Sequence, residues 1–303
     1  MNSIKAIGLS LVFQFVLSSV AYGNFVSLPP QPEAPENPGS AHYAYSLEYK
    51  KLTIDGRKVD VFLPSGMTNS PLIIFGHGQA IDVEGYRLTF EHLAKKGVAV
   101  IHPQFDSGFF DQDWQRMGKD FVSLTEKAIA MFPGRIDKSY TVFSGHSKGG
   151  YVAIVAAGLN LNLKPQAVVL FNLAGYEKSL IKNIDPLIPV TLTWSDSDSV
   201  IKKDLVTEIY TQLPSQKKQL IILKSYPELD ADHFFSLSKS YFFGGKNGIS
   251  PFHYYGTWKW LIGAALDLSQ KTGSTNPYLY GDLAAETGVP GLFHDIERVW
   301  SNE

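Results

Sequence analysis

Short, wholly apolar runs alternate with longer amphipathic stretches along most of this chain. Runs such as 71–75 (PLIIF) and 98–102 (VAVIH) have no polar alternation, which is typical of strands buried on both faces of a sheet. The expected strands lie at residues 59–64, 71–75, 98–102, 140–144, 167–172, 189–194 and 219–224, and the first of them reads as partly exposed. The expected helices lie at residues 84–97, 114–132, 148–160, 202–213 and 254–269. This order favours an α/β fold with a mostly parallel sheet and helices on both faces.

The N-terminus differs from the rest of the chain. Residues 1–23 have the layout of a secretory signal peptide, with a lysine, an apolar run and small residues at the expected cleavage site. The alternative is an uncleaved anchor, but the run is short for a bilayer span of roughly 20 residues. We therefore expect an exported protein, periplasmic or extracellular, with no stable membrane span after cleavage. Residues 24–44 form a proline-rich arm, and residues 45–303 are expected to form a single domain.

Composition narrows the class of protein. Hydrophobic residues make up 44% of the 303 residues and charged residues 18%, which is enough for one large core. The net charge of −2 provides no basic face for a nucleic acid. The chain has no cysteine, so disulfides and a lipidated N-terminal cysteine are excluded, and an exported chain must rely on its core.

The stretch FSGHSKGG (143–150) carries the main chemical signal, because it lies between an expected strand and an expected helix. Gly145 and Gly149 flank Ser147 in the pattern G-x-S-x-G, which is typical of a nucleophile on a sharp strand-to-helix turn. Such a turn places the backbone N–H of Lys148 at a helix N-terminus, where it faces negative charge on a bound carbonyl oxygen. The alternative is a glycine-rich turn in which the serine has no chemical role.

A nucleophilic serine needs a base and a carboxylate at the same edge of the sheet, where the carboxyl ends of parallel strands meet. Asp196 and Asp198 both follow the strand at 189–194. We favour Asp198, because it lies on the loop just before the apolar pair Val200 and Ile201, where the next helix begins to pack. In the alternative, both aspartates are helix-capping residues of an ordinary loop.

The base is expected after the next strand. His233 lies some nine residues past the strand at 219–224, and two phenylalanines follow that are expected to hold its ring. The order Ser, Asp, His, each after a strand, favours His233, with His253 as the alternative. His146 adjoins the serine, but its side chain should point away across the turn.

The second oxyanion donor is expected in the glycine-rich loop after the strand at 71–75. We assign it to the backbone N–H of Gln79, with Gly78 as the alternative, because glycine lets the backbone approach a substrate closely. A metal site formed by Asp106, Asp111 and Asp113 fits no calcium-loop spacing, and these side chains read as solvated loop carboxylates. We expect no metal and no cofactor.

Together these segments resemble the α/β-hydrolase superfamily, in the branch of dienelactone-hydrolase-like enzymes, chlorophyllases and cutinase-like polyesterases. The matching segments are PLIIFGHGQA, HLAKKGVAVIHP, GRIDKSYTVFSGHSKGG, PVTLTWSDSD and DADHFF, within residues 58–240. The resemblance implies the α/β-hydrolase fold, and counting from Pro189 it selects Asp198 as the carboxylate. The elbow GHSKGG is similar to the chlorophyllase form, which has a basic residue after the serine. The chain departs from the family in Trp194 and Ser195, where glycine is usual, and in a tail from Lys246 onward that has no matching motif.

The expected function is therefore that of an exported serine carboxylesterase or lipase-like hydrolase. Ser147, His233 and Asp198 would form the triad and act on a small-molecule or polymeric ester through an acyl-enzyme. An acyltransferase on the same fold and a non-catalytic binding module are the alternatives. The shape of the substrate pocket depends on loop positions, so the sequence pattern indicates no particular ester. It indicates no oligomeric state either.

Overall fold

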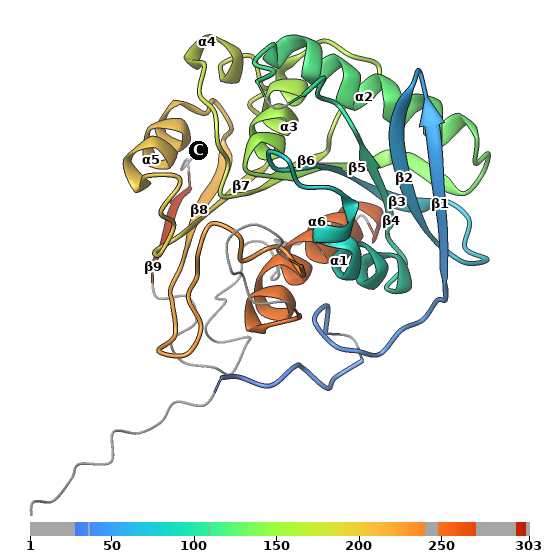
Figure 1. The fold of residues 1–303 in the computed structure, drawn as a ribbon, viewed down its shortest axis with the longest axis horizontal. Coiled ribbons are helices and arrows are strands. Elements are labelled where there is room, and N and C mark those ends of the chain that lie inside the picture. Colours follow the sequence, from blue (N-terminus) through green and yellow to red (C-terminus); the bar gives the residue numbers. More distant parts are fainter. Residues whose placement is uncertain (1–27, 36, 109, 240–247, 271–294, 301–303) are drawn as a thin grey trace, which may run out of the picture.

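The computed structural model describes residues 28–35, 37–108, 110–239, 248–270 and 295–300. The expected signal peptide at residues 1–23 lies outside this part of the chain. Within it, the fold is α/β, with one mostly parallel sheet between two layers of helices (Figure 1). No helix in the described ranges is both long and apolar enough to cross a membrane.

Over the described ranges, the sheet has nine strands in the order β1-β2-β4-β3-β5-β6-β7-β8-β9. The strands are β1 (Leu47–Ile54), β2 (Arg57–Pro64), β3 (Ser70–Gly76), β4 (Ala99–Pro103), β5 (Ile136–His146), β6 (Ala167–Phe171), β7 (Val190–Ser195), β8 (Lys217–Leu223) and β9 (Asp295–Trp300). Strands β4, β3, β5, β6, β7 and β8 run parallel to one another. Antiparallel pairs complete the two edges, β1 and β2 on one side and β9 on the other.

The helices cover both faces of the sheet (Figure 1). They are α1 (Val83–Lys95), α2 (Trp114–Ala130), α3 (Lys148–Gly158), α4 (Lys178–Ile181), α5 (Lys203–Gln212), the π-helix η1 (His253–Thr257) and α6 (Trp258–Gln270). Helices α2, α3, α4 and α5 pack on one face, and α1, η1 and α6 pack on the other. All expected strands and helices are thereby confirmed, with ends that shift by a few residues.

One expectation about burial was wrong. Strand β2 was expected to be partly exposed, but every residue from Val59 to Pro64 is buried. Its alternating side chains enter both cores, since Val61 packs with the α2 side and Phe62 with the α1 side. Strand β1, which was not expected, covers the outer edge of β2 and explains this burial.

The described part of the proline-rich arm is docked on the α1 face. The ammonium group of Lys96 donates to the carbonyl oxygens of Pro35 and Asn37 and to the hydroxyl of Ser40, at 3.3, 3.0 and 2.8 Å. The ring of His92 bonds to the Pro38 carbonyl at 2.7 Å. The described part of the arm therefore belongs to the folded domain.

Because the central strands are parallel, their carboxyl ends meet at one edge of the sheet. The loop after β3 carries Gln79, and the loop after β4 carries Asp106. The turn after β5 carries Ser147, and the loops after β7 and β8 carry Asp198 and His233. The topology alone thus brings the expected site residues to one region.

Candidate active site

Ser147 occupies a strained turn between β5 and α3. Its backbone has φ 53° and ψ −124°, a conformation that non-glycine residues rarely adopt. A side chain at Gly145 would overlap the backbone of Gly149, and one at Gly149 would overlap the carbonyl of Gly76. The two glycines are therefore needed for close packing of the turn against its own helix and against β3. A strained turn closed by two small residues is the geometry that the pattern G-x-S-x-G predicts.

The structure brings Ser147, His233 and Asp198 into one hydrogen-bonded chain. His233 Nε2 lies 3.0 Å from Ser147 Oγ, and His233 Nδ1 lies 2.8 Å from Asp198 Oδ2. The second oxygen of Asp198 accepts the backbone N–H groups of Val200 and Ile201 at 2.8 and 2.7 Å. With Nδ1–H donated to the carboxylate, Nε2 is left to accept the serine proton.

The two alternatives for these positions lie elsewhere. Asp196 accepts the backbone N–H and the hydroxyl of Ser225, at 3.0 and 2.7 Å, and so fastens the loop after β8. His253 lies in η1, where the N–H and hydroxyl of Ser250 both lie 3.1 Å from its Nδ1. Burial lowers the pKa of His253 to about 4, so this imidazole is neutral at ordinary pH.

The His233 ring is enclosed from two sides. Phe234 meets it edge-on, with ring centroids 5.1 Å apart, and the His146 ring lies 4.9 Å away. The second phenylalanine, Phe235, belongs instead to the core on the α1 face. Asn172, at the end of β6, donates its amide to the carbonyl oxygens of Asp232 and His233 at 3.2 and 3.3 Å. The position of the imidazole is therefore set by its own loop and by two neighbouring elements.

The β3–α1 loop, residues 77–82, lies against the start of α3. Its Gly78 N–H donates to the hydroxyl of Tyr86 at 2.9 Å, so the alternative oxyanion donor is already bonded within the protein. Gln79 follows it at a half-buried position, and Lys148 begins α3 directly after the serine. The first N–H groups of a helix have no partner within it, and they form an anion site.

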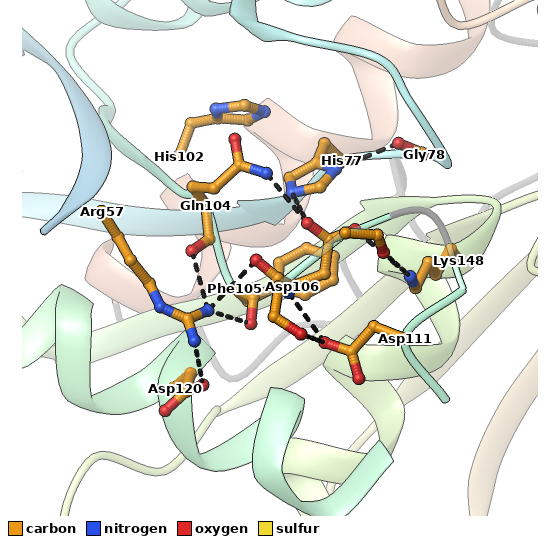
Figure 2. Close-up of polar contacts among 12 residues, drawn as sticks. Arg57, His77, Gly78, His102, Gln104, Phe105, Asp106, Asp111, Asp120 and Lys148 are labelled. Atoms are coloured by element: carbon orange, nitrogen blue, oxygen red, sulfur yellow. Dashed lines mark hydrogen bonds and ion pairs between the residues drawn. The ribbon is translucent and has the colours of Figure 1, made fainter. Parts of the chain in front are cut away.

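The side chain of Lys148 makes a buried ion pair that the sequence did not indicate. Its ammonium group lies 3.2 Å from Asp106 Oδ2, and only 5% and 6% of the two side chains are exposed. The other oxygen of Asp106 accepts the Gln104 amide at 2.9 Å and lies 3.9 Å from His77 Nε2. Figure 2 shows the Asp106 carboxylate between the His77 ring and the Lys148 ammonium group. Asp106 is therefore a buried partner of the residue after Ser147, which corrects the expectation of a solvated carboxylate.

The loop after β4 is also held from β2. Arg57 donates to the carbonyl oxygens of Gln104, Phe105 and Asp106, at 3.4, 2.6 and 3.2 Å (Figure 2). Its second terminal nitrogen lies 3.3 Å from Asp120 in α2. Arg57 thus fixes the backbone of residues 104–106, the segment that carries the Asp106 carboxylate.

The remaining loop carboxylates have separate partners. Asp111 accepts the backbone N–H and hydroxyl of Ser107, at 2.8 and 2.9 Å, and pairs with Arg116. Asp113 caps α2 by accepting the Arg116 N–H at 3.0 Å. Among the residues that the structure describes, no group of three or more His, Cys, Asp or Glu side chains is placed to hold a metal ion.

The sequence did not predict a role beside the triad for three polar residues, which are Tyr86, Asn172 and His146. A weak signal existed for Asn172, which is the last residue of the strand expected at 167–172 and lies at the same edge of the sheet. Tyr86 belongs to α1, and its contact depends on how α1 packs on the sheet. The arrangement as a whole contains a hydroxyl, a base in contact with it and a carboxylate that orients the base.

No protein-family model matches this chain, and no curated protein matches it significantly. The molecule is an α/β protein whose mostly parallel sheet gathers Ser147, His233 and Asp198 at its carboxyl edge. Its function is therefore argued from this geometry.

Proposed function

We propose that this protein is a serine hydrolase of the α/β-hydrolase superfamily that cleaves carboxylic esters. The observation that supports this function most directly is the chain from Ser147 Oγ through His233 to Asp198, with contacts of 3.0 and 2.8 Å. These distances lie within the range of nucleophile–base and base–carboxylate hydrogen bonds. The chain order Ser, Asp, His and the strained serine turn are typical of that superfamily.

In the proposed mechanism, His233 Nε2 removes the hydroxyl proton as Ser147 Oγ attacks the ester carbonyl. Asp198 stabilises the imidazolium that forms. The imidazolium then protonates the leaving alcohol, and an acyl-serine remains. Water, deprotonated by the same imidazole, attacks this acyl group, and the imidazolium returns the proton to Ser147 Oγ as the acid is released.

The oxyanion formed in each step is assigned to the backbone N–H groups of Lys148 and Gln79. The first group belongs to the first turn of α3, where N–H groups and the helix dipole favour negative charge. Removal of one such donor from a hydrolase typically costs about 3 kcal/mol of transition-state stabilisation. Gly78 remains the alternative donor, and its N–H bonds to the Tyr86 hydroxyl in the structure.

The branch of the superfamily and the location of the protein are further parts of the proposal. A basic residue after the serine and the position of Asp198 past Pro189 support the dienelactone-hydrolase, chlorophyllase and cutinase-like branch. The apolar N-terminal stretch with its small-residue cleavage site supports export. A small-molecule or polymeric ester is the proposed substrate.

The test measures turnover of p-nitrophenyl esters of increasing chain length, with a polyester film and a lactone in the same series. Wild-type protein should hydrolyse at least one of them, and Ser147→Ala should lose essentially all of that activity with an unchanged circular dichroism spectrum. A fluorophosphonate probe should label the wild type and not the variant. Retained activity in Ser147→Ala would exclude this nucleophile.

An acceptor alcohol added to the same assay distinguishes hydrolysis from acyl transfer, because a transferase forms a new ester. Absence of both turnover and labelling in the wild type would instead favour a binding module on the same scaffold.

A further inference from the structure

We propose that His146, the residue before the nucleophile, is a positioning residue that connects the β3–α1 loop to the loop of His233. The connection, here called the His146 bridge, consists of the Gly78 N–H, the Tyr86 hydroxyl, the His146 ring and the His233 carbonyl. The inference rests on the proposed ester hydrolysis, because the two connected loops carry the proposed base, His233, and the assigned oxyanion donor, Gln79. It gives a role to a buried imidazole that the mechanism itself does not use.

The chemistry of the partners sets the direction of every bond in the His146 bridge. The His233 carbonyl only accepts, so the His146 Nε2 that lies 2.8 Å from it carries a proton. In a neutral ring Nδ1 then has no proton, and it accepts the Tyr86 O–H at 2.9 Å. The Tyr86 oxygen in turn accepts the Gly78 N–H at 2.9 Å. A single tautomer of His146 satisfies all three contacts.

The surroundings of His146 stabilise this neutral form. The residue is fully buried, and burial lowers its pKa well below the ordinary value, as does the nearby His233 ring. A proton on His146 Nδ1 would occupy the lone pair that now accepts the Tyr86 O–H. The ring can therefore bridge two loops without taking up the proton that His233 carries during the proposed reaction.

The position of His146 in the chain gives the bridge its effect. His146 is covalently joined to Ser147, so its bond to the His233 carbonyl limits the separation between serine and imidazole, where Oγ and Nε2 lie 3.0 Å apart. Asn172 donates to the same carbonyl from the carboxyl end of the neighbouring strand β6, at 3.3 Å. The backbone oxygen of His233 is thus held by two donors from two neighbouring strand ends.

The other end of the bridge acts on the β3–α1 loop. A side chain at Gly78 would come within 2.8 Å of His146 Nδ1, so the loop backbone packs directly on the ring. Gln79, the assigned oxyanion donor, is the next residue. A displacement of His146 is therefore expected to move the oxyanion donor and the base together, and a shift of about 1 Å in such groups lowers a rate by about a hundredfold.

The chain contains a matched control at His92. Its Nε2 bonds to the Pro38 carbonyl at 2.7 Å, and its Nδ1 bonds to the Tyr43 hydroxyl at 3.2 Å. His92 therefore makes the same pair of bonds as His146, and it is also buried, on the α1 face. It holds the N-terminal arm and not the triad.

The experiment compares His146→Asn, His146→Gln and His92→Asn under conditions in which each is fully folded. An asparagine amide reaches the place of Nδ1 and leaves the His233 carbonyl with only the longer bond from Asn172, whereas a glutamine amide reaches the place of Nε2. We expect His146→Asn to lower kcat about tenfold to a hundredfold with KM within about threefold. His146→Gln should recover most of this loss. His92→Asn should lower stability to a similar degree with kcat unchanged.

A second measurement does not depend on activity. In ¹⁵N-labelled wild-type protein, the ring nitrogens of His146, assigned by their loss in His146→Gln, should show the Nε2–H tautomer between about pH 6 and pH 9. An Nδ1–H tautomer or a charged ring in this range would overturn the bridge.

An active wild type in which His146→Asn matches His92→Asn in kcat would overturn the positioning role alone. A wild type with neither turnover nor fluorophosphonate labelling would overturn the proposed function, and the positioning role with it.

Discussion

The ammonium group of Lys148 lies 3.2 Å from the carboxylate of Asp106, and both side chains are almost fully buried. The two residues are 42 positions apart in the sequence, and Lys148 directly follows Ser147. The pair therefore connects the first turn of α3 to the loop after β4. Removing a charge from water costs free energy, and a buried pair is tolerated because each charge compensates the other.

The first prediction concerns this pair. In Lys148→Met the Asp106 carboxylate stays buried without its counter-charge, so the free energy of unfolding should fall by about 3 to 5 kcal/mol. The backbone N–H at position 148 is unchanged, so the folded variant should keep the proposed ester hydrolysis within a few-fold of the wild type. Urea denaturation followed by circular dichroism measures the first effect, and p-nitrophenyl ester turnover measures the second.

The control is the double variant Lys148→Met with Asp106→Asn, in which no charge is left buried. Its stability should exceed that of Lys148→Met. The two residues share one interaction, so the stability losses of their separate substitutions do not add. An equal or larger loss in the double variant would show that the ion pair is not the source of the effect.

The second prediction concerns the orientation of the His233 ring. In Asp198→Asn the amide oxygen can still accept from Val200 and Ile201, while the amide N–H₂ faces His233 Nδ1. This favours the wrong tautomer of the imidazole, so kcat should fall by about 10⁴ with little change in stability. Asp196→Asn is the matched control, because that residue bonds to Ser225 and should retain activity. Comparable losses in the two variants would contradict the assignment of Asp198.

The third prediction concerns acid stability, since several imidazoles are buried in the neutral form. Burial lowers the pKa of each one, to about 3 for His92 and about 4 for His253. The described imidazoles with a lowered pKa are His77, His92, His102, His146 and His253. In the unfolded chain the same groups take up protons near pH 6.5. The unfolded state thus binds more protons below that pH, and folding stability falls as the pH decreases.

The stability from these groups should be complete above about pH 7 and should decline below about pH 6.5, by up to about 1.4 kcal/mol per pH unit for each imidazole. Asp60 and Asp232 act in the opposite direction, because burial raises the pKa of each carboxyl group. Urea midpoints at pH 8, 6 and 5 measure the balance. His253→Gln should have a shallower pH dependence than the wild type, and an unchanged slope would contradict the neutral buried state of His253.

The fourth prediction concerns the docked arm. Lys96→Met removes the donor that bonds to Pro35, Asn37 and Ser40, so stability should fall by about 1 to 2 kcal/mol. Limited proteolysis should then cleave more rapidly within residues 28–44. Lys127→Met is the control, because Lys127 pairs with Asp55, which lies outside the arm. Equal proteolysis of both variants would show that the Lys96 contacts do not hold the arm.

The central strands and the long helices could be predicted from the sequence, because a strand buried on both faces must be apolar throughout. Strand β1 was missed, since an edge strand with charged residues such as Lys50 and Lys51 lacks that pattern. Strand β9 and the four-residue helix α4 were missed as well. The hydrogen bonds of an edge strand come from a neighbour, and a short helix is stabilised by packing more than by its own residues.

The sequence by itself determined the serine turn and the order of Ser147, Asp198 and His233, because each follows a parallel strand and such strands end at the same edge. The choice of Asp198 over Asp196 and of His233 over His253 also agrees with the contacts in the structure. Only the tertiary structure decided the partners of Lys148 and His146, which lie 42 and 60 residues away in Asp106 and Tyr86. A buried polar side chain needs a partner, but its own sequence neighbourhood does not specify which distant group the packing of helices and loops brings within reach.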